Sequence, residues 1–147
     1  TGKRILDGVE GAIDAFVCGV GTGGTLMGVA EALRKVYPNV KIVAVEPAES
    51  AVMSGGKPGV HVIQGIGPGY IPSLMNMDLV DEVVTVTGDE AVNMTRMLMK
   101  EEGLMVGLSS GANVFVALEA AKKSGKGETI VTILPDRGER YFSMNLF

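Results

Sequence analysis

The sequence predicts an α/β fold in which helices cover both faces of an open, mostly parallel, twisted sheet, giving three layers. Two observations support this. Short, continuously apolar runs alternate with segments of helical periodicity, as in parallel sheets that are buried on both faces. Glycine-rich turns follow several of the apolar runs, at the edge where such folds bind ligands. The 147 residues suffice for one hydrophobic core, and no linker interrupts them, so we expect residues 1–147 to form a single lobe.

The first half of the chain alternates helix and strand. Residues 1–11 read as a short helix that Thr1 caps, and residues 15–20 as a buried strand. Residues 25–36 are helical, because Leu26, Val29, Ala30 and Leu33 recur at helical spacing before Pro38. Residues 41–46 ("KIVAVE") form a second buried strand, and residues 48–53 a short helix.

The second half repeats the alternation after a long loop of glycine and proline, residues 59–73. Residues 81–87 predict a third strand and residues 89–102 a helix. A short apolar piece, residues 105–108, precedes a helix that starts at Ser109 or Ser110 and runs to Lys123. Residues 129–134 ("TIVTIL") predict the last strand, and "PDRGERY" follows it.

Composition excludes several classes of function. The net charge is −4 and the basic residues are scattered, which argues against a nucleic-acid binder. Cys18 and His61 are the only residues of their types, so there is no disulfide framework, CxxC metal site or histidine cluster; we expect Cys18 to be a small core residue. No apolar run approaches the length of a membrane span and the N-terminus lacks a signal-peptide core, so we expect a cytoplasmic protein.

The first candidate site is "DAFVCGVGTGGTLMG", residues 14–28. Gly19, Gly21 and Gly24 satisfy G-x-G-x-x-G, and Glu46 ends the next strand, which taken literally is a dinucleotide fingerprint. The physics is more general: such a turn aims backbone N–H groups at an anion at a helix N-terminus, and Thr22 and Thr25 add hydroxyl donors. This favours one compact phosphate; a plain strand-to-helix turn is the alternative. The lysine of a Walker P-loop is absent, which argues against an NTPase.

Two further stretches carry polar or glycine-rich sequence. In "GLSSGAN", residues 107–113, Ser109 and Ser110 stand where a strand ends and a helix begins. They serve either as helix caps or as hydroxyls presented at the ligand-binding edge of the sheet. In "QGIGPGY", residues 64–70, the glycines allow a close approach of the backbone to a ligand or form a flexible connection.

These stretches together resemble the cysteine synthase (O-acetylserine sulfhydrylase) family of fold type II, tryptophan-synthase-β-like enzymes, which use pyridoxal 5′-phosphate. The resemblance is carried, in the family's order, by "GVGTGGTLMG", "VEP", "GVHVIQGIGPGYIP", "GLMVGLSSGAN" and "PDRGERYFSMNLF". It covers nearly the whole chain. It implies one lobe of a fold type II enzyme that joins O-acetyl-L-serine and sulfide into L-cysteine.

The resemblance also implies residue roles. Gly21, Thr22, Gly23, Gly24 and Thr25 would hold the cofactor phosphate. Ser109, with Ser110 as the less favoured choice, would hydrogen-bond the pyridine nitrogen. Gly65, Ile66 and Gly67 would line the substrate side. A neutral hydroxyl does not force protonation of the ring nitrogen, which suits replacement at the β-carbon and disfavours transamination.

One departure from the family matters most. The family's Schiff-base lysine and its substrate-carboxylate loop lie upstream, and neither motif is present here. Because the chain also opens with Thr1, we expect the C-terminal part of a longer enzyme, without a catalytic residue of its own and inactive alone. We expect no metal.

Other functions stay open at this stage. A cystathionine β-synthase-like reaction is the alternative within the class. A NAD-binding Rossmann dehydrogenase and a non-catalytic binding module are alternatives of other classes. The resemblance further implies a homodimer and a groove for the C-terminal tail of serine acetyltransferase.

Overall fold

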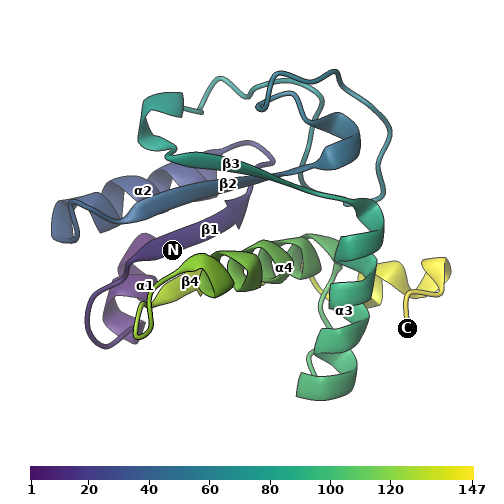
Figure 1. Ribbon diagram of the computed structural model, residues 1–147. Helices are drawn as coiled ribbons and strands as arrows, with labels where there is room; N and C mark the ends of the chain where they lie inside the picture. Colours follow the sequence, from purple (N-terminus) through teal and green to yellow (C-terminus); the bar gives the residue numbers. More distant parts are fainter.

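The computed structural model describes residues 1–147 and contains one four-stranded sheet in the order β3-β2-β1-β4, with all strands parallel. The strands are β1 (Ala15–Gly19), β2 (Lys41–Pro47), β3 (Glu82–Val86) and β4 (Ile130–Thr132). Helices α2 and α4 run along the sheet, and α3 stands at its end beside the C-terminal segment (Figure 1). The predicted parallel α/β fold is confirmed.

Alternate residues of the two central strands, β1 and β2, pack into two separate hydrophobic cores, one on each face of the sheet. Phe16 and Ile42 belong to the core shared with α2 (Gly24–Val36), whereas Val17 and Val43 belong to the core shared with α3 (Gly88–Glu102) and α4 (Leu108–Lys123). All four side chains are at most 2 % exposed. A strand buried on both faces needs apolar side chains at every position, which explains the continuous runs in the sequence.

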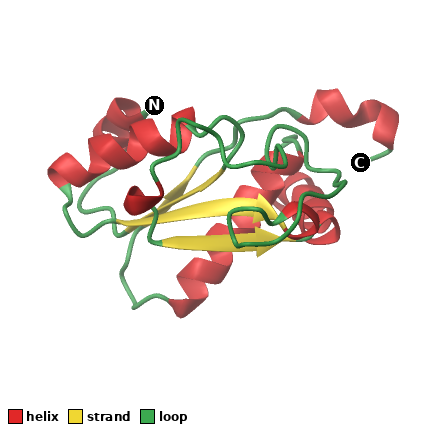
Figure 2. Cartoon of the chain, turned by 90° about the horizontal axis from the view of Figure 1, so that it is seen from above, coloured by secondary structure: helices red, strands yellow, loops and turns green.

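Helices cover both faces of the sheet, as the view from above shows (Figure 2). On one face α2 buries the four positions that its periodicity predicted, Leu26, Val29, Ala30 and Leu33, and α1 (Gly2–Gly8) packs beside it. On the other face α3 begins with a capping box formed by Thr87 and Glu90 and ends at Gly103, whose φ is +69°. No helix is both long enough and apolar enough to cross a membrane.

Several predicted boundaries were wrong. Helix α1 ends at Gly8 instead of residue 11, and Thr1 makes no side-chain cap. Residues 48–53 form only the 3₁₀ turn η1 (Ala48–Ser50), because the N–H groups of Met53 and Ser54 donate to the Glu46 carboxylate instead of continuing a helix.

The remaining differences lie in the second half of the chain. Helix α4 already begins at Leu108, and β4 spans only Ile130–Thr132. Residues 77–79 and 138–144 form the 3₁₀ segments η2 (Met77–Leu79) and η3 (Gly138–Met144), which the periodicity did not predict.

Candidate functional site

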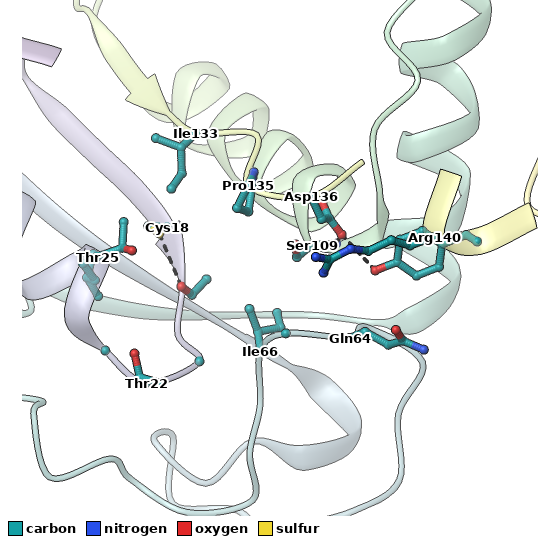
Figure 3. A pocket seen from close by; sticks show the side chains of 16 residues that line it. Cys18, Thr22, Thr25, Gln64, Ile66, Ser109, Ile133, Pro135, Asp136 and Arg140 are labelled. Atoms are coloured by element: carbon teal, nitrogen blue, oxygen red, sulfur yellow. Dashed lines mark hydrogen bonds between the residues drawn. The ribbon is translucent and has the colours of Figure 1, made fainter. Parts of the chain in front are cut away.

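A cavity of about 410 Å³ lies at the carboxyl ends of β1 and β4. Its walls come from segments that are distant in sequence: the end of β1, the turn before α2, residues 64–66, the first turn of α4, and residues 133–141. Thr22 and Thr25 stand on one side, and Ser109, Asp136 and Arg140 on the other (Figure 3). This is the edge at which open α/β sheets bind ligands.

The turn between β1 and α2 presents unpaired amides to the cavity. The backbone N–H groups of Gly21, Thr22, Gly23 and Thr25 make no hydrogen bond within the chain. Gly23 has φ +87°, and a Cβ on Gly21 would overlap the carbonyl oxygen of Gly65, so the turn needs glycine at both positions. Together with the N-terminus of α2, these amides form a cradle of donors that could hold a phosphate-sized anion.

The sequence-predicted residues do not all reach this cavity. Gly21, Thr22, Gly23 and Thr25 line it, and so do Gly65 and Ile66. Gly24 lies outside the lining, where its N–H points to the Thr22 hydroxyl at 3.4 Å. Gly67 is engaged in holding its loop: its N–H donates to Val20 O at 3.0 Å, and its carbonyl lies 2.8 Å from His61 Nε2.

The N-terminus of helix α4 is capped by the carboxylate of Asp136, which lies in the segment after β4. Its N-cap, Gly107, offers no side chain, and Asp136 takes over the capping. Asp136 accepts hydrogen bonds from the backbone N–H groups of Ser109 at 3.1 Å and Ser110 at 2.9 Å, from the Ser110 hydroxyl, and from the Tyr141 hydroxyl at 2.9 Å. A carboxylate at a helix N-terminus is also favoured by the helix dipole.

This arrangement shifts the pKa values of both acidic groups. Burial acts to raise the pKa of Asp136, but the hydrogen bonds from Ser110, Tyr141 and Ser109 together outweigh it and hold that pKa below its ordinary value. Burial and the neighbouring Asp136 carboxylate raise the pKa of Tyr141 to about 12. At neutral pH the pair is therefore a carboxylate and a neutral phenol.

The two serines of α4 have different surroundings. The Ser110 side chain is fully buried, and its hydroxyl bonds to Asp136. The Ser109 hydroxyl has no partner within the chain, and Ser109 lines the cavity. Of these two serines, only Ser109 thus offers a free hydroxyl to a ligand.

Asn113 ties the two strands at the cavity together. Its Oδ1 accepts from Gly19 N–H at 2.8 Å, and its Nδ2 donates to Ile133 O at 3.0 Å. The side chain is 1 % exposed. This buried amide therefore adds to the strand pairing and to the hydrogen bond from the Thr132 hydroxyl to Val17 O, which also hold β1 and β4 together.

Glu46, the residue that a dinucleotide-binding protein would use on a ribose, lies away from the cavity. It is 1 % exposed, and its carboxylate accepts from Met53 N–H and Ser54 N–H at 2.8 Å and from the Ser54 hydroxyl at 2.6 Å. A ribose could bind it only by displacing these donors. The geometry therefore argues against the dinucleotide reading.

Charged side chains are sparse at the cavity. Asp136 and Arg140 are the charged residues that line the cavity, and no lysine does.

Cys18 belongs to the hydrophobic core and also lines the cavity. Its thiol donates to Gly19 O at 3.3 Å, and the residue is 2 % exposed, so the predicted core role is confirmed.

Sequence reasoning assigned no individual role to Asn113, Asp136 or Tyr141. The partners of the first two lie far away in sequence, 94 residues for Asn113 to Gly19 and 26 for Asp136 to Ser110, so spacing could not pair them, and Tyr141 acts through Asp136. The sequence did hold one signal: "PDRGERY" directly follows the last predicted strand, so Asp136 and Tyr141 could be expected near the ligand-binding edge of the sheet.

Comparison with known proteins agrees with this geometry. Residues 1–136 match the family model described as "Pyridoxal-phosphate dependent enzyme". The chain is 51 % identical to the cysteine synthase of Staphylococcus aureus (strain Mu50) over 148 aligned positions, which cover 100 % of this chain and 48 % of that protein. The chain thus spans about half the length of the curated relatives that it matches.

Solved structures show the same likeness. O-acetyl serine sulfhydrylase isoform 3 from Entamoeba histolytica superposes with a TM-score of 0.96 at 46 % identity, covering 99 % of this chain and 44 % of that one. The O-acetylserine dependent cystathionine beta-synthase from Helicobacter pylori superposes with a TM-score of 0.90 at 36 % identity, covering 97 % and 46 %.

Proposed function

The chain belongs to the family of pyridoxal-phosphate dependent enzymes, and we propose that it is the cofactor-binding, C-terminal part of a cysteine synthase. In the intact enzyme, sulfide would replace the acetate of O-acetyl-L-serine to give L-cysteine. The single observation that carries this is that one cavity has, on opposite sides, an amide cradle at α2 and a Ser109 hydroxyl at α4, neither of which has a partner within the chain. The 51 % identity to a cysteine synthase supports the reaction.

The cradle at α2 is assigned to the cofactor phosphate. Two helices begin at this cavity, and Asp136 already fills the N-terminus of α4. The amides of Gly21, Thr22, Gly23 and Thr25 at the start of α2 have no partner within the chain and are free for an anion. Gly24 then contributes through the shape of the turn, because its N–H points to Thr22.

Ser109 is assigned to the pyridine nitrogen, and Gly65 and Ile66 to the substrate side. With its phosphate at α2, the cofactor would lie in the same cavity as the Ser109 hydroxyl, which has no partner within the chain and could bind the ring nitrogen. When bound, the cofactor supplies an electron sink. A neutral hydroxyl does not force protonation of the ring nitrogen, so the ring would withdraw electrons less strongly than it would beside a carboxylate. Gly67 supports this loop from outside the cavity.

We further propose that residues 1–147 form one lobe and do not catalyse by themselves. The absence of any lysine from the cavity lining supports a Schiff-base lysine supplied from outside these residues. The test is to load the full-length protein that contains this chain with pyridoxal phosphate, reduce it with borohydride and map the peptides. We expect one phosphopyridoxyl-lysine outside this segment; an adduct on a lysine within it would contradict the proposal.

Activity is tested in parallel with two nucleophiles. O-acetylserine with sulfide should give cysteine, whereas O-acetylserine with homocysteine tests the cystathionine β-synthase-like alternative, which the 0.90 TM-score to the Helicobacter pylori enzyme keeps open. A protein that uses homocysteine efficiently and sulfide poorly would favour the alternative. A protein that binds no pyridoxal phosphate would contradict both.

Assembly and location belong to the same proposal. We propose a cytoplasmic homodimer that also accepts the tail of a serine acetyltransferase. Exposed apolar side chains support self-association; among them are Tyr70 at 64 %, Leu74 at 62 % and Phe142 at 59 % exposure. Light scattering and titration with an acetyltransferase tail peptide test the two parts separately.

A further inference from the structure

Asp136 reaches the N-terminus of α4 from the segment after β4, and both of its oxygens are engaged. Oδ1 accepts from the backbone N–H of Ser110 at 2.9 Å and from the Ser110 hydroxyl. Oδ2 accepts from the backbone N–H of Ser109 at 3.1 Å and from Tyr141 at 2.9 Å. One carboxylate thus fixes two consecutive residues of the first turn of α4.

This bonding pattern decides which serine faces the cavity. Asp136 binds Ser110 through both its N–H and its hydroxyl, so the Ser110 side chain is turned away from the cavity and fully buried. Asp136 binds Ser109 through the N–H alone, which leaves the Ser109 hydroxyl free. Tyr141, 1 % exposed, restrains the carboxylate from the side of η3.

We propose that Asp136 is the positioning residue of this end of the cavity, fixing the first turn of α4 so that Ser109 and not Ser110 presents its hydroxyl to the cofactor ring. The inference rests on the proposed function, because it assumes that a pyridine ring lies against Ser109. Without the carboxylate, the backbone N–H groups of Ser109 and Ser110 and the Tyr141 hydroxyl lose their acceptor, and the Ser110 hydroxyl keeps only the backbone carbonyl oxygen of residue 136 at 3.3 Å. The turn would rearrange to satisfy them, and small misplacements of a contacting group have large functional effects.

The test uses the full-length protein loaded with pyridoxal phosphate and compares Asp136→Asn with Ser109→Ala. Asn keeps the size of the side chain, but an NH₂ group replaces one of the two carboxylate oxygens. This group cannot accept the hydrogen bonds that the replaced oxygen accepted. Asp89→Asn is the matched control: Asp89 also lies in the first turn of a helix, α3, but is exposed and distant from the cavity lining. The readouts are cofactor affinity by fluorescence titration and the absorption maximum of the bound cofactor.

We expect Asp136→Asn to weaken cofactor affinity on the order of tenfold and to shift the absorption maximum in the same direction as Ser109→Ala. Asp89→Asn should change neither. If Ser109→Ala shifts the absorption maximum but Asp136→Asn changes only the melting temperature, Asp136 is merely structural and the inference is overturned. If the unaltered protein binds no pyridoxal phosphate, the proposed function itself fails.

Tyr141→Phe provides a second variant in case Asp136→Asn does not fold. Phe fills nearly the same buried volume and removes only the hydroxyl donor to Oδ2. We expect a smaller shift of the absorption maximum in the same direction. A folded Tyr141→Phe protein with unchanged absorption and unchanged cofactor affinity would overturn the inference.

Discussion

Asn113 Oδ1 lies 2.8 Å from the backbone nitrogen of Gly19, and this hydrogen bond joins α4 to the end of β1 at the cavity. The other end of the same amide donates to Ile133 O at 3.0 Å. Because the side chain is 1 % exposed, water cannot readily replace either bond. Together with the direct pairing of β1 and β4, Asn113 therefore helps to set the width of the cavity between β1 and the segment after β4.

Replacing Asn113 with Ala should destabilise the protein and weaken cofactor binding together. The change leaves Gly19 N–H and Ile133 O, which are partly buried, without partners, at a cost of about 1–3 kcal/mol in the free energy of unfolding. Urea unfolding and a cofactor titration measure the two effects. Asn93→Ala is the control, because Asn93 is exposed on α3 and makes no side-chain hydrogen bond. Equal stability of the two variants would show that the Asn113 bonds contribute nothing.

Gly21→Ala should distort the phosphate cradle and weaken cofactor binding while leaving the sheet intact. The added Cβ would overlap Gly65 O, so the turn or the loop of residues 64–66 must move. Losing one charge-assisted hydrogen bond to the phosphate weakens cofactor binding by roughly 10- to 100-fold. Gly28→Ala is the matched control within α2, since nothing lies within 4 Å of its added Cβ. It should bind the cofactor normally and be more stable by up to about 1 kcal/mol.

Local sequence patterns were sufficient for most of the fold. The residues that recur at helical spacing in α2 are all buried, and the central strands carry continuous apolar runs, residues 15–18 and 42–45, because both of their faces are covered. Predictions failed where a distant or unexpected partner competes with the local pattern. The helix expected after Ala48 stops because Glu46 captures the N–H groups of Met53 and Ser54.

The candidate site divides in the same way. The turn of residues 21–25 is local, so its glycines and threonines could be recognised from the sequence as an anion cradle. The choice between Ser109 and Ser110 depends on Asp136, which is 26 residues from Ser110, and no spacing rule pairs them. The cofactor roles of all these residues stay predictions until they are tested.

Ser109→Ala and Ser110→Ala should separate function from stability. The Ser109 hydroxyl has no partner within the chain, so its removal should change the spectrum of the bound cofactor and lower kcat with little effect on unfolding. Ser110→Ala removes a buried bond to the Asp136 carboxylate and should cost about 1–3 kcal/mol of stability. Steady-state kinetics and urea unfolding on both variants decide the matter. The reverse pattern would assign the ring contact to Ser110.

The stability contributed by Asp136 should disappear on acidification. Its pKa is lowered in the folded protein, so its stabilisation is complete above the ordinary value of 3.8 and is lost as pH falls through the depressed folded value. Urea midpoints measured between pH 7 and pH 3 should fall less steeply for Asp136→Asn than for the unaltered protein. Asp89→Asn, which removes a charge from the first turn of α3, serves as the reference. Parallel curves for Asp136→Asn and the unaltered protein would contradict the lowered pKa.

Cys18 should resist alkylation until the protein unfolds. Burial raises the pKa of its thiol to about 12, so almost no thiolate is present at pH 8, and the side chain is only 2 % exposed. Peptide mapping after iodoacetamide treatment should find Cys18 unmodified in the native protein and fully modified in urea. Ser73→Cys supplies an exposed control thiol in the same molecule, and it should react within minutes under native conditions. Native labelling of Cys18 at a rate near that of the control would mean that the end of β1 opens readily to solvent, so that the cavity wall it forms is not rigid.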